Sequence, residues 1–214
     1  MQRSGVCDVS DRWLEVMSTL LLALAAVATA WSSYQSARWT AEYRDASGRT
    51  NAVRIEAARA QSRAQAERAV DLATFTQWID AYALRRSKLR DFYFKRLRKE
   101  FKPAVVAWIA AKPRTNPKAP LTPFVMPQYK LAAADEARQL DAEAGVFSAL
   151  GQQYTLRGTN YLLAVVLFAM SLFFAGISTK LGGRGFKTIV LLCGWVIFLG
   201  TVIWVATTPI SLAV

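Results

Sequence analysis

The sequence contains no histidine, which removes the side chain that proteins use most often as a general base and as a metal ligand. It has only two cysteines, Cys7 and Cys193, which are far apart in the chain. We expect no disulfide between them and no zinc site, because no CxxC pair or Cys/His cluster occurs. Glycine-rich phosphate loops and the GxSxG nucleophile pattern are also missing. The sequence therefore predicts no enzyme, no metal and no cofactor.

Charged residues are nearly absent from three apolar blocks, at about residues 14–31, 159–178 and 188–208, with Glu15 at the edge of the first. A bilayer core about 30 Å thick needs about 20 mostly apolar helical residues. The second and third blocks meet this length, and the first is shorter. We predict an all-α membrane protein with transmembrane helices at 13–34, 159–178 and 188–208. An ion-coupled carrier is disfavoured, since such proteins need ionisable groups within their spans.

The first block has two interpretations. The run Ala28-Thr29-Ala30 resembles the small-x-small site that signal peptidase cleaves. The segment before it, however, has a net charge of about zero rather than the positive charge of a signal peptide. No Gly or Pro occurs between Val6 and Ser47. We therefore expect an uncleaved anchor whose helix continues beyond the membrane.

The short loop at 179–187 carries Lys180, Arg184 and Lys187 and no acid, and the tail at 209–214 has no charged side chain. Basic residues in short loops favour the cytoplasmic side. This pattern predicts that the loop and the N-terminal tail (1–12) lie inside. Residues 35–158, between the first two spans, would then lie outside.

The region between the first two spans is charged and helical in pattern. Residues 32–158 hold 22 of the 27 Lys and Arg and 12 of the 15 Asp and Glu. A helix is expected over 50–101, where Gly and Pro are absent, and its apolar face would contain Leu72, Phe75, Ile79 and Tyr82. Pro103 is expected to start a short helix. The five prolines of 112–128 predict a tip that reverses the chain, before a helix that runs from about residue 129 into the second span.

Helix lengths add a constraint on this region. At 1.5 Å per residue, residues 32–102 would extend about 105 Å, whereas 129–158 would return only about 45 Å. The outgoing arm is therefore expected to fold, and Gly48 is the expected bend.

Two sites at the first span are singled out by spacing and charge. Trp31, Tyr34, Gln35 and Arg38 follow helical spacing and are expected to pack against the segment near 154–161. Glu15 in a ring of subunits could form the acidic mouth of a cation channel. A single Glu15 fits better as an interface residue at a helix N-terminus, where the dipole favours an anion.

The stretch at 85–102 has nine Lys and Arg against Asp91 and Glu100. Its candidate anion-binding residues are Arg85, Arg86, Lys88, Arg90, Lys95, Arg96, Arg98 and Lys99. The pattern fits a solvated helix face with its aromatic residues in the core. It also fits a surface for lipid headgroups or an acidic protein. Nucleic acid is disfavoured by the membrane anchor and by the predicted outside placement.

Several segments resemble a family of bacterial membrane proteins of unknown function. They are ATAWSSYQSARW, EFKPAVVAWIAAKP, NPKAPLTPFVMPQY and NYLLAVVLFAMSLFFAGIS. The resemblance spans nearly the whole chain and keeps the order of anchor, helical domain with a proline-rich tip, and two closing spans. It implies a bacterial inner-membrane location and no particular activity. The leading hypothesis is therefore a non-enzymatic scaffold or interaction protein that self-associates in the lipid bilayer, and the alternative is a subunit of an oligomeric channel.

Overall fold

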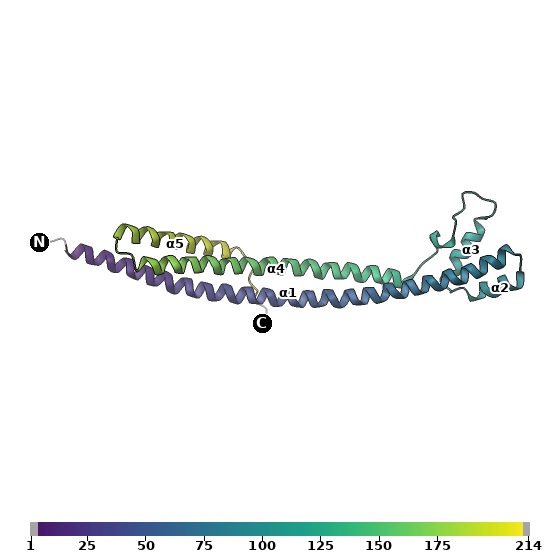
Figure 1. Cartoon of the computed structure of the whole chain (residues 1–214), viewed down its shortest axis with the longest axis horizontal. Coiled ribbons are helices and arrows are strands. Elements are labelled where there is room, and N and C mark those ends of the chain that lie inside the picture. The colour runs from purple at the N-terminus through teal and green to yellow at the C-terminus, as the bar shows by residue number, and fades with distance from the viewer. Residues whose placement is uncertain (1–3, 212–214) are drawn as a thin grey trace. The chain divides into compact units, whose positions relative to one another are not determined.

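The computed structural model describes the chain from Ser4 to Ser211, with side chains from Arg12 onward. The described residues are all-α, as the sequence predicted, and they contain no strand. The elements in chain order are α1 (Ser4–Ala83), α2 (Ser87–Arg96), α3 (Lys102–Ala110), the short 3₁₀ helix η1 (Pro123–Val125), α4 (Ala132–Ser178) and α5 (Arg184–Ala206) (Figure 1).

Three helices are long and apolar enough to span a membrane, namely α1, α4 and α5. Each contains one of the three apolar blocks, so the expectation of a multi-pass membrane protein is confirmed. One detail differs from the prediction. The long helix is not a separate element between the first two spans, because α1 already contains the first span and continues without a break to Ala83.

The expected bend at Gly48 is therefore wrong. A single glycine in a helix costs about 1 kcal/mol relative to alanine, which is too little to end a long helix whose neighbouring turns form well. A Cβ atom at Gly48 would meet nothing within 4 Å, so no close approach requires a glycine there. The mismatch in length is taken up instead by residues 84–131, which turn back before α4 begins at Ala132. The unbroken return helix, predicted from about residue 129, is confirmed as α4.

The described residues form two compact units. We call residues 4–48 and 147–211 the span unit, and residues 49–146 the helical domain. In the span unit α4 runs antiparallel to α1, because Ser18 of α1 meets Ser178 while Ser36 meets Gly158. A short turn at 179–183 then leads back into α5, which packs with both other helices (Figure 1).

The core of the span unit combines residues from all three helices. Its buried apolar members are Leu21, Ala25, Ala164, Phe168, Ala175, Leu191 and Phe198. The helices approach closely at Gly194 of α5, where an added Cβ would lie 3.1 Å from Leu21 Cδ2 and 3.2 Å from Phe174 Cβ. Small residues let helices approach closely in lipid, where packing rather than the hydrophobic effect holds spans together. Gly194 has this role within the chain, whereas a Cβ at Gly200 would meet nothing within 4 Å.

The helical domain has a core of its own, which is mainly aromatic. Its buried members are Phe75, Trp78, Leu97, Phe101, Ala104, Val105 and Trp108. Phe75 lies 5.6 Å from Trp108 and 5.8 Å from Phe124 between ring centroids, both edge to face. Such pairs contribute about 1 kcal/mol each beyond the area that they bury. The core therefore joins the end of α1 to α2, α3 and the segment around η1.

The predicted helix over 50–101 is wrong in its extent, because α1 ends at Ala83 and α2 begins at Ser87. Arg85 has a φ of 53°, the left-handed conformation that commonly follows a helix. The amide of Arg86 donates to the carbonyl of Ala81 at 2.9 Å, which satisfies one of the last carbonyls of α1. No Gly or Pro marks this turn, so the sequence pattern did not show it. The short helix at Pro103 is confirmed as α3.

The predicted apolar face of the outgoing helix is also rotated. Phe75 and Trp78 are buried, but Leu72 is 54% exposed. Asp71 lies on the same side of the helix as Phe75 and Trp78, and it is 1% exposed. The buried face of α1 in the helical domain therefore begins with a carboxylate.

Candidate functional site

Gln35 of α1 is a fully buried polar side chain of the span unit. Its Oε1 accepts a hydrogen bond from the backbone N–H of Ser211 at 3.1 Å, and its Nε2 donates to the Ser211 carbonyl at 3.4 Å. Tyr161 donates to the carbonyl of Pro209 at 3.2 Å. These contacts fasten the segment after α5 to α1 and α4.

Gln35, a member of the predicted packing face, is buried, but its hydrogen bonds join it to Ser211 and not to the predicted partner segment at 154–161. The two aromatic members of the face are exposed. Trp31 is 44% exposed and Tyr34 is 54% exposed, and their rings lie 6.0 Å apart between centroids. Arg38 is half-buried. The buried positions of this stretch are Ser32, Gln35 and Trp39, which lie on a neighbouring stripe of the helix. Aromatic side chains are suited to a lipid interface without protein packing, so their size did not identify the buried side.

The predicted partner segment, 154–161, does contact α1, but through other residues. The ring of Trp39 lies 5.6 Å from that of Tyr154, and the guanidinium of Arg157 lies 4.7 Å from the centroid of Trp39. Ser36 Oγ donates to the carbonyl of Gly158 at 3.1 Å. α1 and α4 are thus joined here by an aromatic pair, a cation–π contact and a hydrogen bond.

We expect Gln35→Ala to lower the stability of the span unit by about 2 kcal/mol, because it leaves the buried Ser211 amide and carbonyl without partners. Trp31→Ala is the matched control, since Trp31 is 44% exposed and its ring lies 6.0 Å from that of Tyr34 between centroids. The measurement is the thermal midpoint of the full chain in detergent. An equal fall for both variants would contradict the assignment of Gln35 as the buried fastening.

Glu15, the candidate member of an acidic ring, has a side chain that is 68% exposed. Its Oε1 lies 4.0 Å from Nζ of Lys187 at the start of α5. This cation reduces the local negative charge on which a cation-selective mouth would depend. Ser18 of the first span is buried, and its Oγ lies 3.0 Å from Ser178 Oγ, so this hydroxyl is not exposed to line a pore. The channel alternative stays a prediction, and neither contact favours it.

The basic stretch at 85–102 contains exposed cations and one arginine, Arg98, that is paired inside the domain. The exposed members of the predicted patch are Arg85, Arg86, Lys88, Lys95, Arg96 and Lys99. Arg90 forms an ion pair with its neighbour Asp91 at 2.8 Å. Arg98 does not belong to the patch, because its side chain is 21% exposed and faces inward to Asp71.

Asp71 and Arg98 form a bidentate pair inside the helical domain. Nη2 of Arg98 lies 2.8 Å from Oδ2 of Asp71, and its Nε donates to Oδ1 at 3.2 Å. The hydroxyl of Tyr129 donates to the same Oδ2 at 3.2 Å. Glu67 and Glu100 lie 3.1 and 3.4 Å from Nη1 of the arginine. We call this set the Asp71 network, and it connects α1 to the chain before α3 and before α4.

The Asp71 network was missed by sequence analysis. A carboxylate is rarely fully buried without a partner, and nothing in the charge pattern assigned Arg98 to Asp71 rather than to solvent. The sequence signal that could have indicated the burial of Asp71 was its position. It lies four residues before Phe75 and seven before Trp78, on one helical face. The hydrogen bond to Asp71 raises the pKa of Arg98, which keeps the guanidinium charged.

Desolvation, with the neighbouring Asp71 carboxylate, raises the pKa of Tyr129 from 10.0 to about 12. Folding therefore favours the neutral phenol. Its contribution to stability is complete below pH 10.0 and is lost as the pH rises from 10.0 to about 12. We expect the denaturation midpoint of the helical domain to fall over this range, and to fall less in Tyr129→Phe than in the unchanged chain. Tyr34→Phe, at an exposed ring of the span unit, is the control and should leave the fall unaltered.

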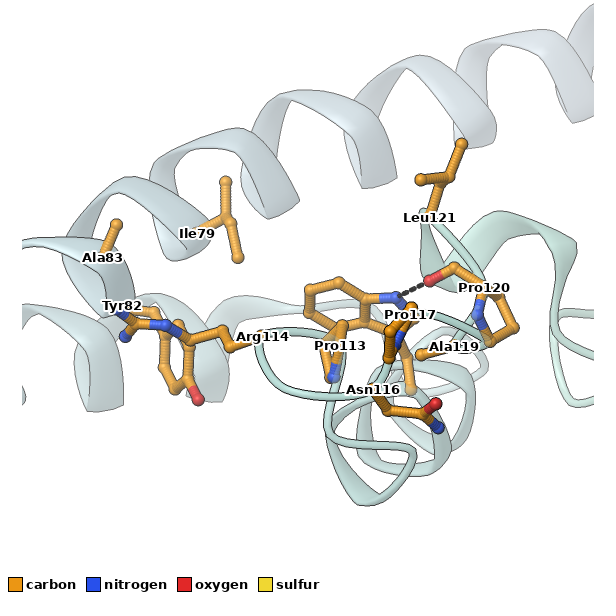
Figure 2. A pocket seen from close by; sticks show the side chains of 11 residues that line it. Ile79, Tyr82, Ala83, Pro113, Arg114, Asn116, Pro117, Ala119, Pro120 and Leu121 are labelled. Atoms are coloured by element: carbon orange, nitrogen blue, oxygen red, sulfur yellow. Dashed lines mark hydrogen bonds between the residues drawn. The ribbon is translucent and has the colours of Figure 1, made fainter.

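An open groove of about 420 Å³ lies in the helical domain between the end of α1 and the proline-rich tip (Figure 2). Trp108 is one of the lining residues, and its Nε1 donates to the carbonyl of Pro120 at 2.7 Å. The guanidinium of Arg114 lies 5.8 Å from the ring centroid of Tyr82, and Arg114 is the one charged residue in the lining. The other lining side chains are mostly apolar, among them Ile79, Pro117 and Leu121.

Cys193 is a free, exposed thiol on α5. The side chain of Cys7 lies outside the described side chains, so the expectation that the two cysteines do not pair stays a prediction. No group of three or more potential metal ligands occurs among the residues that the structure describes.

No family model matches the chain, and no curated protein and no solved structure matches it either. The resemblance to bacterial membrane proteins of unknown function therefore stays a prediction.

Proposed function

We propose that this chain is an integral membrane protein without enzymatic activity, which serves as a helical interaction protein and binds an acidic partner through its helical domain. The observation that carries the proposal is the charge of residues 84–130, which we call the cationic segment. It contains thirteen Lys and Arg and two Asp and Glu. Of these two acids, Asp91 pairs with Arg90 and Glu100 lies beside Arg98. The remaining Lys and Arg of the segment have no carboxylate within 4.0 Å among the described residues.

A surface with this excess of positive charge attracts anionic partners over several ångströms and speeds their association. The core beneath it is ordered by the aromatic cluster and by the Asp71 network. The exposed cations of α2 are therefore presented on a preformed helix, which lowers the entropy cost of binding. The apolar groove beside Trp108 is consistent with binding rather than with turnover.

The test uses the full chain in phosphatidylcholine nanodiscs and fluorescent poly-glutamate as the acidic probe. We expect binding that weakens steeply with added salt, and that falls tenfold or more in the variant Lys88→Gln/Lys95→Gln/Arg96→Gln. Arg49→Gln/Arg54→Gln/Arg59→Gln removes the same charge from exposed positions of α1 and should retain most of the binding. Equal losses in the two variants would contradict the proposal, and so would the absence of binding both to this probe and to an anionic membrane.

The proposal places the helical domain on the extracytoplasmic side of the bacterial inner membrane. It is supported by the basic residues of the loop between α4 and α5, Lys180, Arg184 and Lys187. The contact between Glu15 and Lys187 agrees, because it brings the start of α1 to the same end of the span unit as this loop. A chain with both cysteines changed to Ser and with Ser87→Cys should react with an impermeant maleimide in intact cells. Reaction only after lysis would reverse the placement.

Self-association is the second part of the proposal. The outward side of α5 exposes Leu192, Val196, Leu199 and Ile203, and Cys193 lies next to this row. These side chains meet either lipid or another copy of the chain. With Cys7→Ser, mild oxidation in native membranes should give a disulfide-linked dimer through Cys193. A chain that stays monomeric under oxidation would show that this side of α5 faces lipid.

A further inference from the structure

The outer face of α2 combines cations with apolar side chains. Its members are Lys88, Leu89, Phe92, Lys95 and Arg96, which fall within one third of the helix circumference at 100° per residue. All five are exposed, with Leu89 at 38% and Phe92 at 45%. The inner side of the same helix packs on the domain core through Tyr93 and Phe94. Leu89 and Phe92 are therefore exposed, whereas Tyr93 and Phe94 of the same helix contact the core.

The charges on this face are not neutralised by the domain. Lys88, Lys95 and Arg96 have no carboxylate within 4.0 Å among the described residues. The guanidinium of Arg96 lies 3.5 Å from the ring centroid of Phe92. This contact holds a cation and an exposed aromatic ring side by side. A partner must therefore supply negative charge and an apolar environment within a few ångströms of each other.

We propose that the outer face of α2 binds an anionic phospholipid surface, with Lys and Arg on the phosphates and with Phe92 and Leu89 below the headgroups. This inference rests on the proposed function and names the partner class of the same site. A membrane interface places phosphate directly above hydrocarbon, which is the arrangement that the face matches. Phosphates of a nucleic acid would engage the cations but would leave Leu89 in water. An acidic protein is the alternative that the test must separate.

The experiment places the full chain in phosphatidylcholine nanodiscs and measures co-flotation with two kinds of vesicle. One kind is pure phosphatidylcholine, and the other contains equal parts of phosphatidylcholine and phosphatidylglycerol. We expect flotation only with the second kind, weaker at high salt. Lys88→Gln/Lys95→Gln/Arg96→Gln should weaken partition about a hundredfold. Phe92→Ser should weaken it about tenfold and should leave its dependence on salt unchanged.

The matched control is Arg49→Gln/Arg54→Gln/Arg59→Gln, which removes the same charge from exposed positions of α1 outside the cationic segment. It should retain most of the flotation. An equal loss in this control, or an unaltered partition in Phe92→Ser, would overturn the assignment to the outer face of α2. All substituted side chains are exposed, so the fold is expected to persist, and circular dichroism of each variant verifies this.

The poly-glutamate measurement separates the two proposals. Binding of poly-glutamate without flotation on phosphatidylglycerol vesicles would overturn the lipid inference and leave an acidic protein as the partner. Absence of both would overturn the proposed function as well. Flotation that the α2 variants abolish, together with retained flotation in the control, supports the lipid surface.

Discussion

Replacing Asp71 by alanine is expected to destabilise the helical domain by about 3 kcal/mol, because it leaves the partly buried Arg98 without its principal counter-charge. The carboxylate itself is fully buried and accepts hydrogen bonds from Nε of Arg98 and from the hydroxyl of Tyr129. Glu67 and Glu100 remain near Nη1, but they do not reach Nε or Nη2. The loss of stability should therefore be only partly relieved by the remaining acids.

The measurement is hydrogen exchange of the full chain in detergent, which reports on the domain separately from the spans. Peptides from α1 near Asp71 and from α3 should lose protection in Asp71→Ala, and peptides from α5 should not. Asp91→Ala is the control, since its pair with Arg90 is solvent-exposed and such pairs contribute under about 1 kcal/mol. Equal protection in Asp71→Ala and in the unchanged chain would show that the Asp71 network does not hold the domain together.

A double variant tests the charge pair itself. Asp71→Leu/Arg98→Met replaces both partners by apolar side chains of similar size. Removing one partner of a buried pair is costly, whereas replacing both is often nearly neutral. We expect the double variant to be more stable than Asp71→Leu alone. A double variant that is as unstable as the sum of the two single changes would mean that the two residues act independently.

The second large effect is expected at Gly194 of α5. Gly194→Leu places a branched side chain where a Cβ alone would lie 3.1 Å from Leu21 and 3.2 Å from Phe174. Overpacking of this kind costs about 1 to 3 kcal/mol, and more when the helices must separate. We expect a clear fall in the thermal midpoint of the span unit, with a smaller fall for Gly194→Ala.

Gly200→Leu is a close control for this change. It lies on the same helix six residues later, and its Cβ would meet nothing within 4 Å. It should leave stability in detergent unaltered. The readout is the fraction of full chain that stays monodisperse after heating. A similar fall for both leucine variants would show that leucine is poorly tolerated on α5 in general, and would contradict the close packing of α5 on α1 and α4.

The sequence by itself determined the helical class and the three candidate spans, because span length and apolar composition are properties of local runs. The short helix at Pro103 and the irregular proline-rich tip were also predictable. The restricted φ of proline and its missing N–H act on the residues around it, whatever the rest of the chain does.

Only the tertiary structure decided which stripe of each helix is buried. Neighbouring stripes differ by a rotation of 100° per residue, and both 31, 34, 38 and 32, 35, 39 have helical spacing. The buried stripe depends on the contacts that the opposite helix can make. On α4, Gly158 accepts a hydrogen bond from Ser36, and the ring of Tyr154 packs against that of Trp39. For the same reason Asp71 is buried and Leu72 is exposed. A buried carboxylate is stable only when it has a counter-charge, which Arg98 supplies to Asp71. Arg98 is distant in sequence, so the local pattern around Asp71 could not predict the pair.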